Sequence, residues 1–140
     1  MTPRIHNIVM HDVAAALRAS PELAGVAVVE QNSEDLAAML AKEEAQLDGP
    51  VAVVTVDDVR KLHSNPAVYA VAFSVAVTEY VPLRLEGETR TAIDVAMAAG
   101  EAVDAAGHGH FDELTHTTPG GGVLEAVAKC SGEFQLTTTN

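Results

Sequence analysis

The sequence predicts an α+β fold: a mostly antiparallel mixed sheet of about four or five strands with two or three helices packed on it. Apolar residues recur at helical spacing in some segments and form short β-branched runs in others, and hairpin-length turns separate the later strands. The chain has 140 residues, 48% of them hydrophobic, which is enough to bury one core. We therefore expect a single α+β domain over residues 1–140.

The beginning of the chain predicts a helix, a strand and a second helix. Apolar residues share one helical face over residues 5–19, and Ser20-Pro21 ends that helix because proline disfavours helical geometry in the residue before it. The β-branched run at residues 25–30 predicts a strand. The second helix, over residues 33–47, begins at a serine N-cap and ends at Asp48-Gly49-Pro50.

The middle of the chain predicts two strands joined by a loop. Residues 51–56 (VAVVTV) are apolar at nearly every position, which suits a central strand covered on both faces. Residues 57–66 are polar and contain Asn65-Pro66, so we expect a loop there, with a short turn of helix within it as the alternative. Residues 68–85 form the longest expected strand. Its large side chains occupy one phase and its small ones the other, and Pro82 places its far end at an edge or outside the sheet.

The last part of the chain predicts a helix and a loop. Many alanines and an amphipathic pattern predict the helix over residues 89–106, with Gly107 as its natural end. Residues 107–122 contain several glycines and histidines and are expected to form a loop or arm.

The C-terminal residues 123–140 are predicted to form a hairpin. Its two strands cover residues 123–130 and 133–138, and Ser131-Gly132 forms the turn. A short helix over residues 123–129 is the alternative.

Composition excludes several classes of function. Eight Lys and Arg stand against twenty Asp and Glu, which gives a formal net charge of −12 with neutral histidines. This balance opposes phosphate binding, so we expect no specific nucleic-acid binding. No apolar run reaches the roughly 18 residues of a membrane span, so we expect no membrane partner. The single cysteine, Cys130, cannot form an internal disulfide, and we expect it to be buried and inert.

One cluster of potential metal ligands occurs in the sequence, and it contains His108, His110, Asp112, Glu113 and His116. An extended His-x-His segment directs both imidazoles to one side, and a carboxylate nearby would complete a site. However, the cluster lies in the expected glycine-rich loop and lacks a helical His-Glu-x-x-His arrangement, so a solvated polar loop is favoured. We assign no metal ligand and no cofactor.

No other pattern indicates an active site. His63-Ser64, with Asp57 and Asp58 nearby, lacks the Gly-x-Ser-x-Gly elbow of a nucleophilic serine. Gly120-Gly121-Gly122 lacks the Lys-Ser/Thr of a phosphate loop and is interpreted as a hinge or turn. We assign no catalytic residue and expect the protein not to be an enzyme.

A recognisable order of elements runs through nearly the whole chain. Pro21-Glu22-Leu23 leads into a strand, a helix ends at Asp48-Gly49-Pro50, the long strand VYAVAFSVAVTEYVPL follows, another helix comes after Arg90, and the chain ends in FQLTTT. This order resembles that of the tail-terminator and tail-completion (neck) proteins of long-tailed bacteriophages.

The resemblance implies a homohexameric ring that caps the tail tube, ends its polymerisation and joins the tail to the neck or connector. It implies a structural virion protein made in the host bacterial cytoplasm. Its partners would be other copies of itself, the tail tube protein and the neck or head–tail connector protein. An acidic ring would repel the phosphates of DNA passing through it, and ring assembly would supply partners for free strand edges.

Within this resemblance, we predict where the contacts between subunits or with the tube lie. The candidates are the rim segment Arg84-Leu85-Glu86 together with Phe134 and Leu136, and for Phe134 a place in the core is the alternative. The segment 107–122 fits no element of the family and is interpreted as a contact arm.

Two other functions remain open at this point. One is a small metal-binding or enzymatic module that uses His108, His110 and His116. The other is a bacterial partner-binding α+β domain.

Overall fold

The computed structural model describes residues 4–30, 50–80 and 91–136. Within these ranges the chain forms two α-helices, a short 3₁₀ helix and five strands. The elements are α1 (Ile5–Ala19), η1 (Pro21–Leu23), β1 (Ala27–Glu30), β2 (Val51–Ser64), β3 (Ala67–Tyr80), α3 (Ala92–Ala106), β4 (His110–Gly120) and β5 (Val123–Gln135). The predicted α+β class is confirmed.

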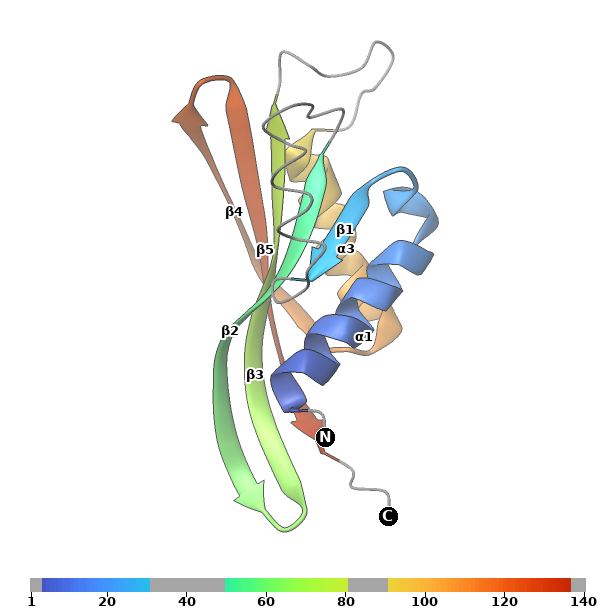
Figure 1. Ribbon diagram of the computed structural model, residues 1–140, viewed down its shortest axis with the longest axis vertical. Helices are drawn as coiled ribbons and strands as arrows, with labels where there is room; N and C mark the ends of the chain where they lie inside the picture. The colour runs from blue at the N-terminus through green and yellow to red at the C-terminus, as the bar shows by residue number, and fades with distance from the viewer. Residues whose placement is uncertain (1–3, 31–49, 81–90, 137–140) are drawn as a thin grey trace.

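All five strands belong to one sheet, in the order β1-β2-β3-β5-β4 (Figure 1). β1 pairs with β2 in parallel and the other three pairs are antiparallel, so the sheet is mixed and mostly antiparallel, as predicted. The hairpin of β2 and β3 extends past both helices at the lower end of the molecule (Figure 1). From here on, the arm is residues 57–70 of this hairpin and not the contact arm expected at residues 107–122.

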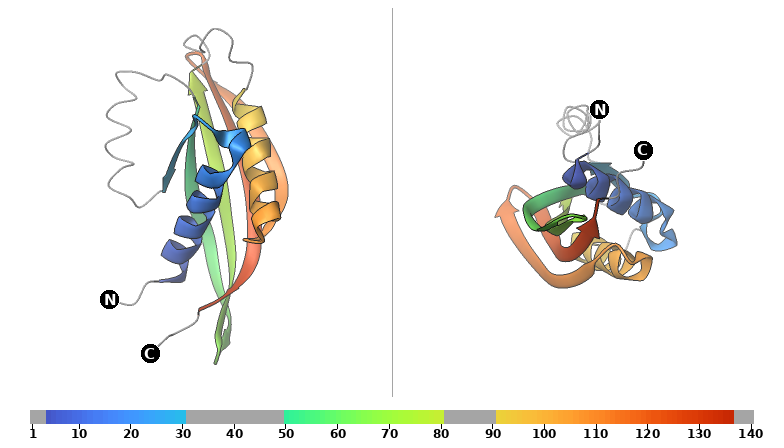
Figure 2. Two further views of the ribbon diagram at one scale, coloured as in Figure 1. Left: turned by 90° about the vertical axis from the view of Figure 1, so that its right-hand side faces the viewer. Right: turned by 90° about the horizontal axis from the view of Figure 1, so that it is seen from below.

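Both helices pack on the same face of the sheet (Figure 2). α1 contacts β1 and β2, α3 contacts β3, β4 and β5, and the two helices also contact each other. We call this face the helix face. The opposite side is the open face, because no helix in the described ranges covers it.

The core lies between the helices and β3. The large side chains of β3, among them Val71, Phe73 and Val75, point to the helix face and are buried. The small side chains, such as Ala70 and Ala72, occupy the other phase and lie on the open face. The predicted division of this strand into a large and a small phase is therefore confirmed.

α3 is the predicted alanine-rich helix, with Thr91 as its N-cap. Thr91 Oγ1 accepts a hydrogen bond from the Asp94 N–H at 3.2 Å, and Asp94 Oδ2 accepts one from the Thr91 N–H at 3.0 Å. Gly107 ends the helix in the left-handed region, with φ 74°. Between these ends, Gly100 allows a close approach to β4, because a Cβ there would lie 2.6 Å from the ring of Phe111.

The predicted loop over residues 57–66 is wrong. β2 continues to Ser64, and only Asn65-Pro66 forms the turn to β3. From Asp57 to Ser64 every side chain of β2 is exposed, so this part of the strand has no buried phase. Without a buried phase the apolar and polar residues do not alternate, and alternation is the pattern that predicts a strand.

The predicted loop over residues 107–122 is also wrong for most of its length, because residues 110–120 form β4. Phe111 and Leu114 both pack against the core, although they are three residues apart. A β-bulge between Phe111 and Glu113 adds one residue to the strand at this point. The bulge interrupts the two-residue period and so hides the strand in the sequence.

The predicted C-terminal hairpin with a turn at Ser131-Gly132 is wrong, and so is the alternative short helix, because β5 runs without a break from Val123 to Gln135. Gly132 instead lies in a tightly packed place within the strand: a Cβ there would lie 3.1 Å from the Phe134 ring and 3.2 Å from the Gly109 Cα. The hairpin instead joins β4 to β5.

The turn of this hairpin is Gly120-Gly121-Gly122, which agrees with its interpretation as a turn. The φ angles of the three glycines are 118°, 65° and 81°, values that other residues rarely adopt.

Three predictions fall outside the described residues. They are the helix over residues 33–47, the end of the long strand over residues 81–85, and the rim segment Arg84-Leu85-Glu86.

Candidate interaction surface

The two edges of the sheet are unpaired on their outer sides within the described residues. On one side, β1 pairs only with Val51–Val54, the first four residues of β2, and leaves the outer side of residues 55–64 free. On the other side, β4 pairs with β5 alone. Free backbone N–H and C=O groups along an edge favour pairing with a further strand.

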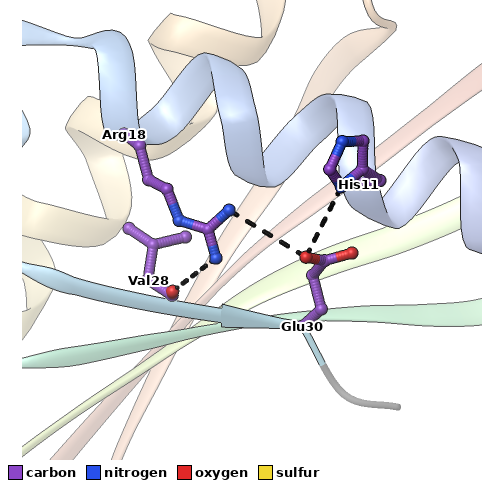
Figure 3. Close-up of polar contacts among 4 residues, drawn as sticks. All are labelled: His11, Arg18, Val28 and Glu30. Atoms are coloured by element: carbon purple, nitrogen blue, oxygen red, sulfur yellow. Dashed lines mark hydrogen bonds and ion pairs between the residues drawn. The ribbon is translucent and has the colours of Figure 1, made fainter. Parts of the chain in front are cut away.

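Contacts with α1 hold the end of β1 in place (Figure 3). Arg18 Nη2 donates a hydrogen bond to the Val28 carbonyl oxygen at 2.9 Å, and Arg18 Nη1 lies 3.9 Å from Glu30 Oε2. His11 Nδ1 lies 3.7 Å from the same oxygen. These contacts join α1 to the last residues of β1 and thus help to set where the free edge of β2 begins.

Two β-bulges lie at the same level of the sheet. The register of β2 shifts between Val56 and Asp58, and that of β4 shifts between Phe111 and Glu113. Phe73 of β3 is opposite Val56 and, through β5, level with Phe111. Because a bulge bends its strand and increases the local twist, the sheet bends at this level.

The open face is hollowed along this bend. One hollow, of about 920 Å³, has Ala70 and Ala72 in its floor and extends to the turn between α3 and β4. Another hollow, of about 570 Å³, contains Ser74. Five carboxylates and two cationic groups of β2, β4 and β5 surround these floors: Asp57, Asp58, Asp112, Glu113, Glu133, Arg60 and Lys129. The surface is therefore acidic and suited to repelling anions rather than binding them.

Two hydrogen bonds order the rim of the hollow beside β4. Ser131 Oγ donates to Asp112 Oδ2 at 2.6 Å, which joins β5 to the bulge of β4. The Phe111 N–H donates to Asp104 Oδ1 at 3.2 Å, which joins the start of β4 to the end of α3.

The structure separates the candidate metal ligands. His108 and His110 both line the larger hollow, and His110 Nδ1 lies 4.0 Å from Asp104 Oδ1. His116 is opposite Ala126, whose side chain points to the helix face, so it lies on the other side of the sheet. Over the described ranges, no group of three or more His, Cys, Asp or Glu side chains is placed to hold a metal ion.

The other candidate residues for chemistry also lie apart. His63 and Ser64 are exposed at the tip of the arm, whereas Asp57 lies next to the smaller hollow. Cys130 is buried, as predicted. Burial raises the pKa of its thiol to about 12, and the nearby carboxylates of Asp112 and Asp104 add to this increase. The thiol is therefore protonated at neutral pH and a poor nucleophile.

The arm is the part of the surface that the sequence reasoning missed. It exposes Val59 and Leu62, and Arg60 and Lys61 lie between them. Lys61 Nζ lies 6.0 Å from the centre of the Tyr69 ring, near the limit of a cation–π contact. Val59 and Leu62 are three residues apart, so they form no alternating pattern, and the sequence of this segment gives no signal of a strand.

The two predicted contact residues that can be placed lie at the end of β5. Phe134 is half-buried and packs edge-on against Phe73, with ring centroids 6.3 Å apart. Leu136 is half-buried just after the strand, and its N–H donates to the Ala67 carbonyl oxygen at 2.9 Å. Phe134 therefore contributes to packing against the core, and its role in a subunit contact stays a prediction, as does that of Leu136.

No protein-family model matches the sequence, and no curated protein matches it. Neither helix in the described part of the chain is long and apolar enough to cross a membrane.

Proposed function

We propose that this protein is the tail terminator of a long-tailed bacteriophage, a structural subunit of a ring that caps the tail tube, ends its polymerisation and joins the tail to the neck. The observation that carries this proposal is a single sheet that, among the described residues, has an unpaired strand edge on each side, at residues 55–64 and at β4. When a subunit binds the next copy through two different unpaired edges, every copy is added in the same orientation. Repeated addition produces a closed ring if the rotation between neighbouring copies is a whole fraction of a full turn.

The charge of the open face supports a ring with a passage for DNA. In such a ring the acidic open face lines the channel, and the chain as a whole carries a formal charge of −12. Carboxylates along the channel repel the phosphates of the genome, so the DNA passes without binding.

The arm supports a partner along the axis of the ring. It extends past the helices at one end of the molecule and exposes Val59 and Leu62 there (Figure 1). Apolar side chains at the end of a ring favour stacking on another ring, and the tail tube protein is the partner that we propose for the arm.

The state of assembly tests the proposal. We expect purified protein to form a ring, of six copies by the family resemblance, in size-exclusion chromatography with light scattering and in negative-stain images. The same measurement is made with the neighbouring tail tube protein, because some terminators assemble only on the tube. A strict monomer at high concentration in both experiments would contradict the proposal.

Two further observations separate this proposal from the alternatives. Genes for a tail tube and a head–tail connector beside this one would agree with a terminator and disagree with a bacterial regulatory domain. Stoichiometric metal in protein purified without a histidine tag, lost on replacing His108, His110 and His116 with alanine, would instead favour the metal-binding module.

Leu136→Lys tests one predicted contact. Because Leu136 is half-buried at the end of β5, we expect the charge to impair ring formation while the free energy of unfolding changes by only about 0.5 kcal/mol. Gln135→Lys, at the exposed neighbouring position, is the matched control. Loss of folding in Leu136→Lys would instead assign this residue to the core.

A further inference from the structure

We propose that neighbouring copies join through β4 of one copy and residues 55–64 of β2 of the next, which pair as antiparallel strands of one continuous sheet. This inference rests on the proposed ring and specifies its subunit interface. It places the helices on the outside of the ring and the open face on the channel.

The directions of the strands permit this pairing. β2 and β4 run in opposite directions within one copy, because three antiparallel pairings separate them. Rotation about an axis roughly along the strands leaves their directions unchanged. β4 of one copy therefore meets β2 of the next in the antiparallel sense, without any inversion of the subunit.

The lengths of the two edges also match. β2 has 14 residues, and the first four of them pair with β1, which leaves ten. β4 has 11 residues. A neighbouring β4 can therefore cover the free part of β2 and lie end to end with β1 without displacing it.

β4 and the free part of β2 lie at different positions along the strand direction within one copy, and the tilt of barrel strands brings them side by side between copies. Thr115, in the middle of β4, is level with Ala76 of β3, whereas Arg60, in the middle of the free part of β2, is opposite Ala70. From Ala76 to Ala70 is six residues, or roughly 20 Å. Because the neighbouring β4 takes the same strand position as β1, four strand positions separate successive copies. Barrel strands tilt by about 35–45°, which over four strands displaces successive copies along the strands by roughly 13–19 Å. The required displacement is close to the upper limit of this range.

The direction of this displacement decides which face is outside. The fixed twist of a sheet makes barrel strands slope upward to the right when seen from outside, so each copy on the right is displaced upward along the strands. Seen from the helices, with the arm at the bottom, β4 forms the right edge and β2 lies to its left (Figure 2, left). β4 also begins above the tip of the arm, since His110 is level with Asp58 and the arm continues down to Asn65-Pro66. The two edges therefore meet only with the helices outside.

Opposite charges lie near each other across the two edges in this register. Arg60 of β2 and Glu113 of β4 both lie on the open face. A displacement of six residues places Glu113 beside His63 and diagonally from Arg60, whereas Lys61 lies beside Leu114 on the helix face. The acidic pair at residues 57–58 of β2 lies beside Thr117 and Thr118, so it faces no carboxylate there. Cross-strand pairs of opposite charge stabilise strand pairing, and like charges oppose it.

Charge reversal on each edge tests the interface. One variant combines Arg60→Glu with Lys61→Glu on β2, and the other combines Asp112→Lys with Glu113→Lys on β4. We expect each to raise the concentration at half-assembly about tenfold or more, because like charges then lie at diagonal positions 60 and 113 across the two edges. The chain that carries both sets of changes is expected to assemble within about threefold of the natural protein, because the charges at these two positions are opposite again.

One control variant changes charge away from the edges: Glu101→Lys, on the exposed side of α3. It is expected to assemble like the natural protein. Thermal melting checks that every variant is folded before assembly is measured.

A disulfide cross-link tests the register. Cysteines at Arg60 and Thr115 of the same chain are expected to join neighbouring copies, so that oxidised rings give a covalent ladder on a denaturing gel. Cysteines at Thr55 and Glu113, which are level within one copy, are expected to give no ladder. The natural Cys130 is left in place because it is buried.

The outcomes distinguish this inference from the proposed function. Rings that form equally well in both edge variants overturn the inference and leave the ring proposal intact. Filaments that the edge variants prevent support the edge pairing and reject the ring. A natural protein that stays monomeric, alone and with the tube protein, rejects both.

Discussion

Replacement of Gly100 by alanine tests the packing that places β4 beside α3. Alanine favours the interior of a helix over glycine by about 1 kcal/mol. Its Cβ, however, would lie 2.6–2.7 Å from three ring atoms of Phe111, well inside ordinary van der Waals contact. Such overpacking costs about 3 kcal/mol, because both the helix and the paired strand resist movement. We therefore expect Gly100→Ala to destabilise the protein by about 2 kcal/mol.

Urea unfolding followed by circular dichroism measures this change. In a Phe111→Ala background the clash is absent, so Gly100→Ala is expected to stabilise that protein by about 1 kcal/mol through helix propensity alone. The difference between Glu101→Ala and Glu101→Gly, on the exposed side of the same helix, calibrates the propensity term. Stabilisation by Gly100→Ala in the natural background would refute the reasoning, because Phe111 would then not lie on Gly100 and β4 would not have the observed position.

Three further predictions concern single side chains. The Cys130 thiol, with its pKa raised to about 12, should not react with Ellman's reagent at pH 8 until urea unfolds the chain. Because the thiol of the unfolded chain titrates near 9.0, the free energy of unfolding should fall as the pH rises above 9. Cys130→Ala should remove the part of this fall that the thiol causes. Thr91→Ala should lower the free energy of unfolding by about 1 kcal/mol in urea titrations through loss of the capping box, whereas Thr91→Ser should keep most of it. Arg18→Lys should lower it by about 0.5 kcal/mol, less so in high salt, because an ammonium does not reproduce the forked contact with Val28 and Glu30. Equal stability of Arg18→Lys at all salt concentrations would show that this contact contributes nothing.

The elements with one buried face could be predicted from the sequence. The helix over residues 5–19 and the helix ending at Ala106 followed from apolar residues at helical spacing, and the phases of β3 followed from its alternation of large and small side chains. In each case burial on one side imposes a period that a single segment displays by itself.

The candidate surface could not be predicted in the same way. Residues 57–64 are exposed on both sides and carry no period, and the bulge between Phe111 and Glu113 breaks the period of β4. Ser131-Gly132 has residue types typical of a turn, but Gly132 instead packs closely against Gly109, which is distant in the chain. The strands that form this surface therefore lack the alternation of apolar and polar residues by which a strand is predicted from sequence.

The sequence by itself determined that this chain is an acidic α+β protein with a core of small aliphatic side chains, because composition and periodicity depend only on neighbouring residues. Tertiary structure alone decided which strands are edges. The order β1-β2-β3-β5-β4 places β1 and β4 at opposite sides of the sheet, and among the described strands the short β1 pairs with only the first four residues of β2 on that side. Edges arise from pairings between distant segments, so their position is a property of the assembled sheet rather than of any one strand.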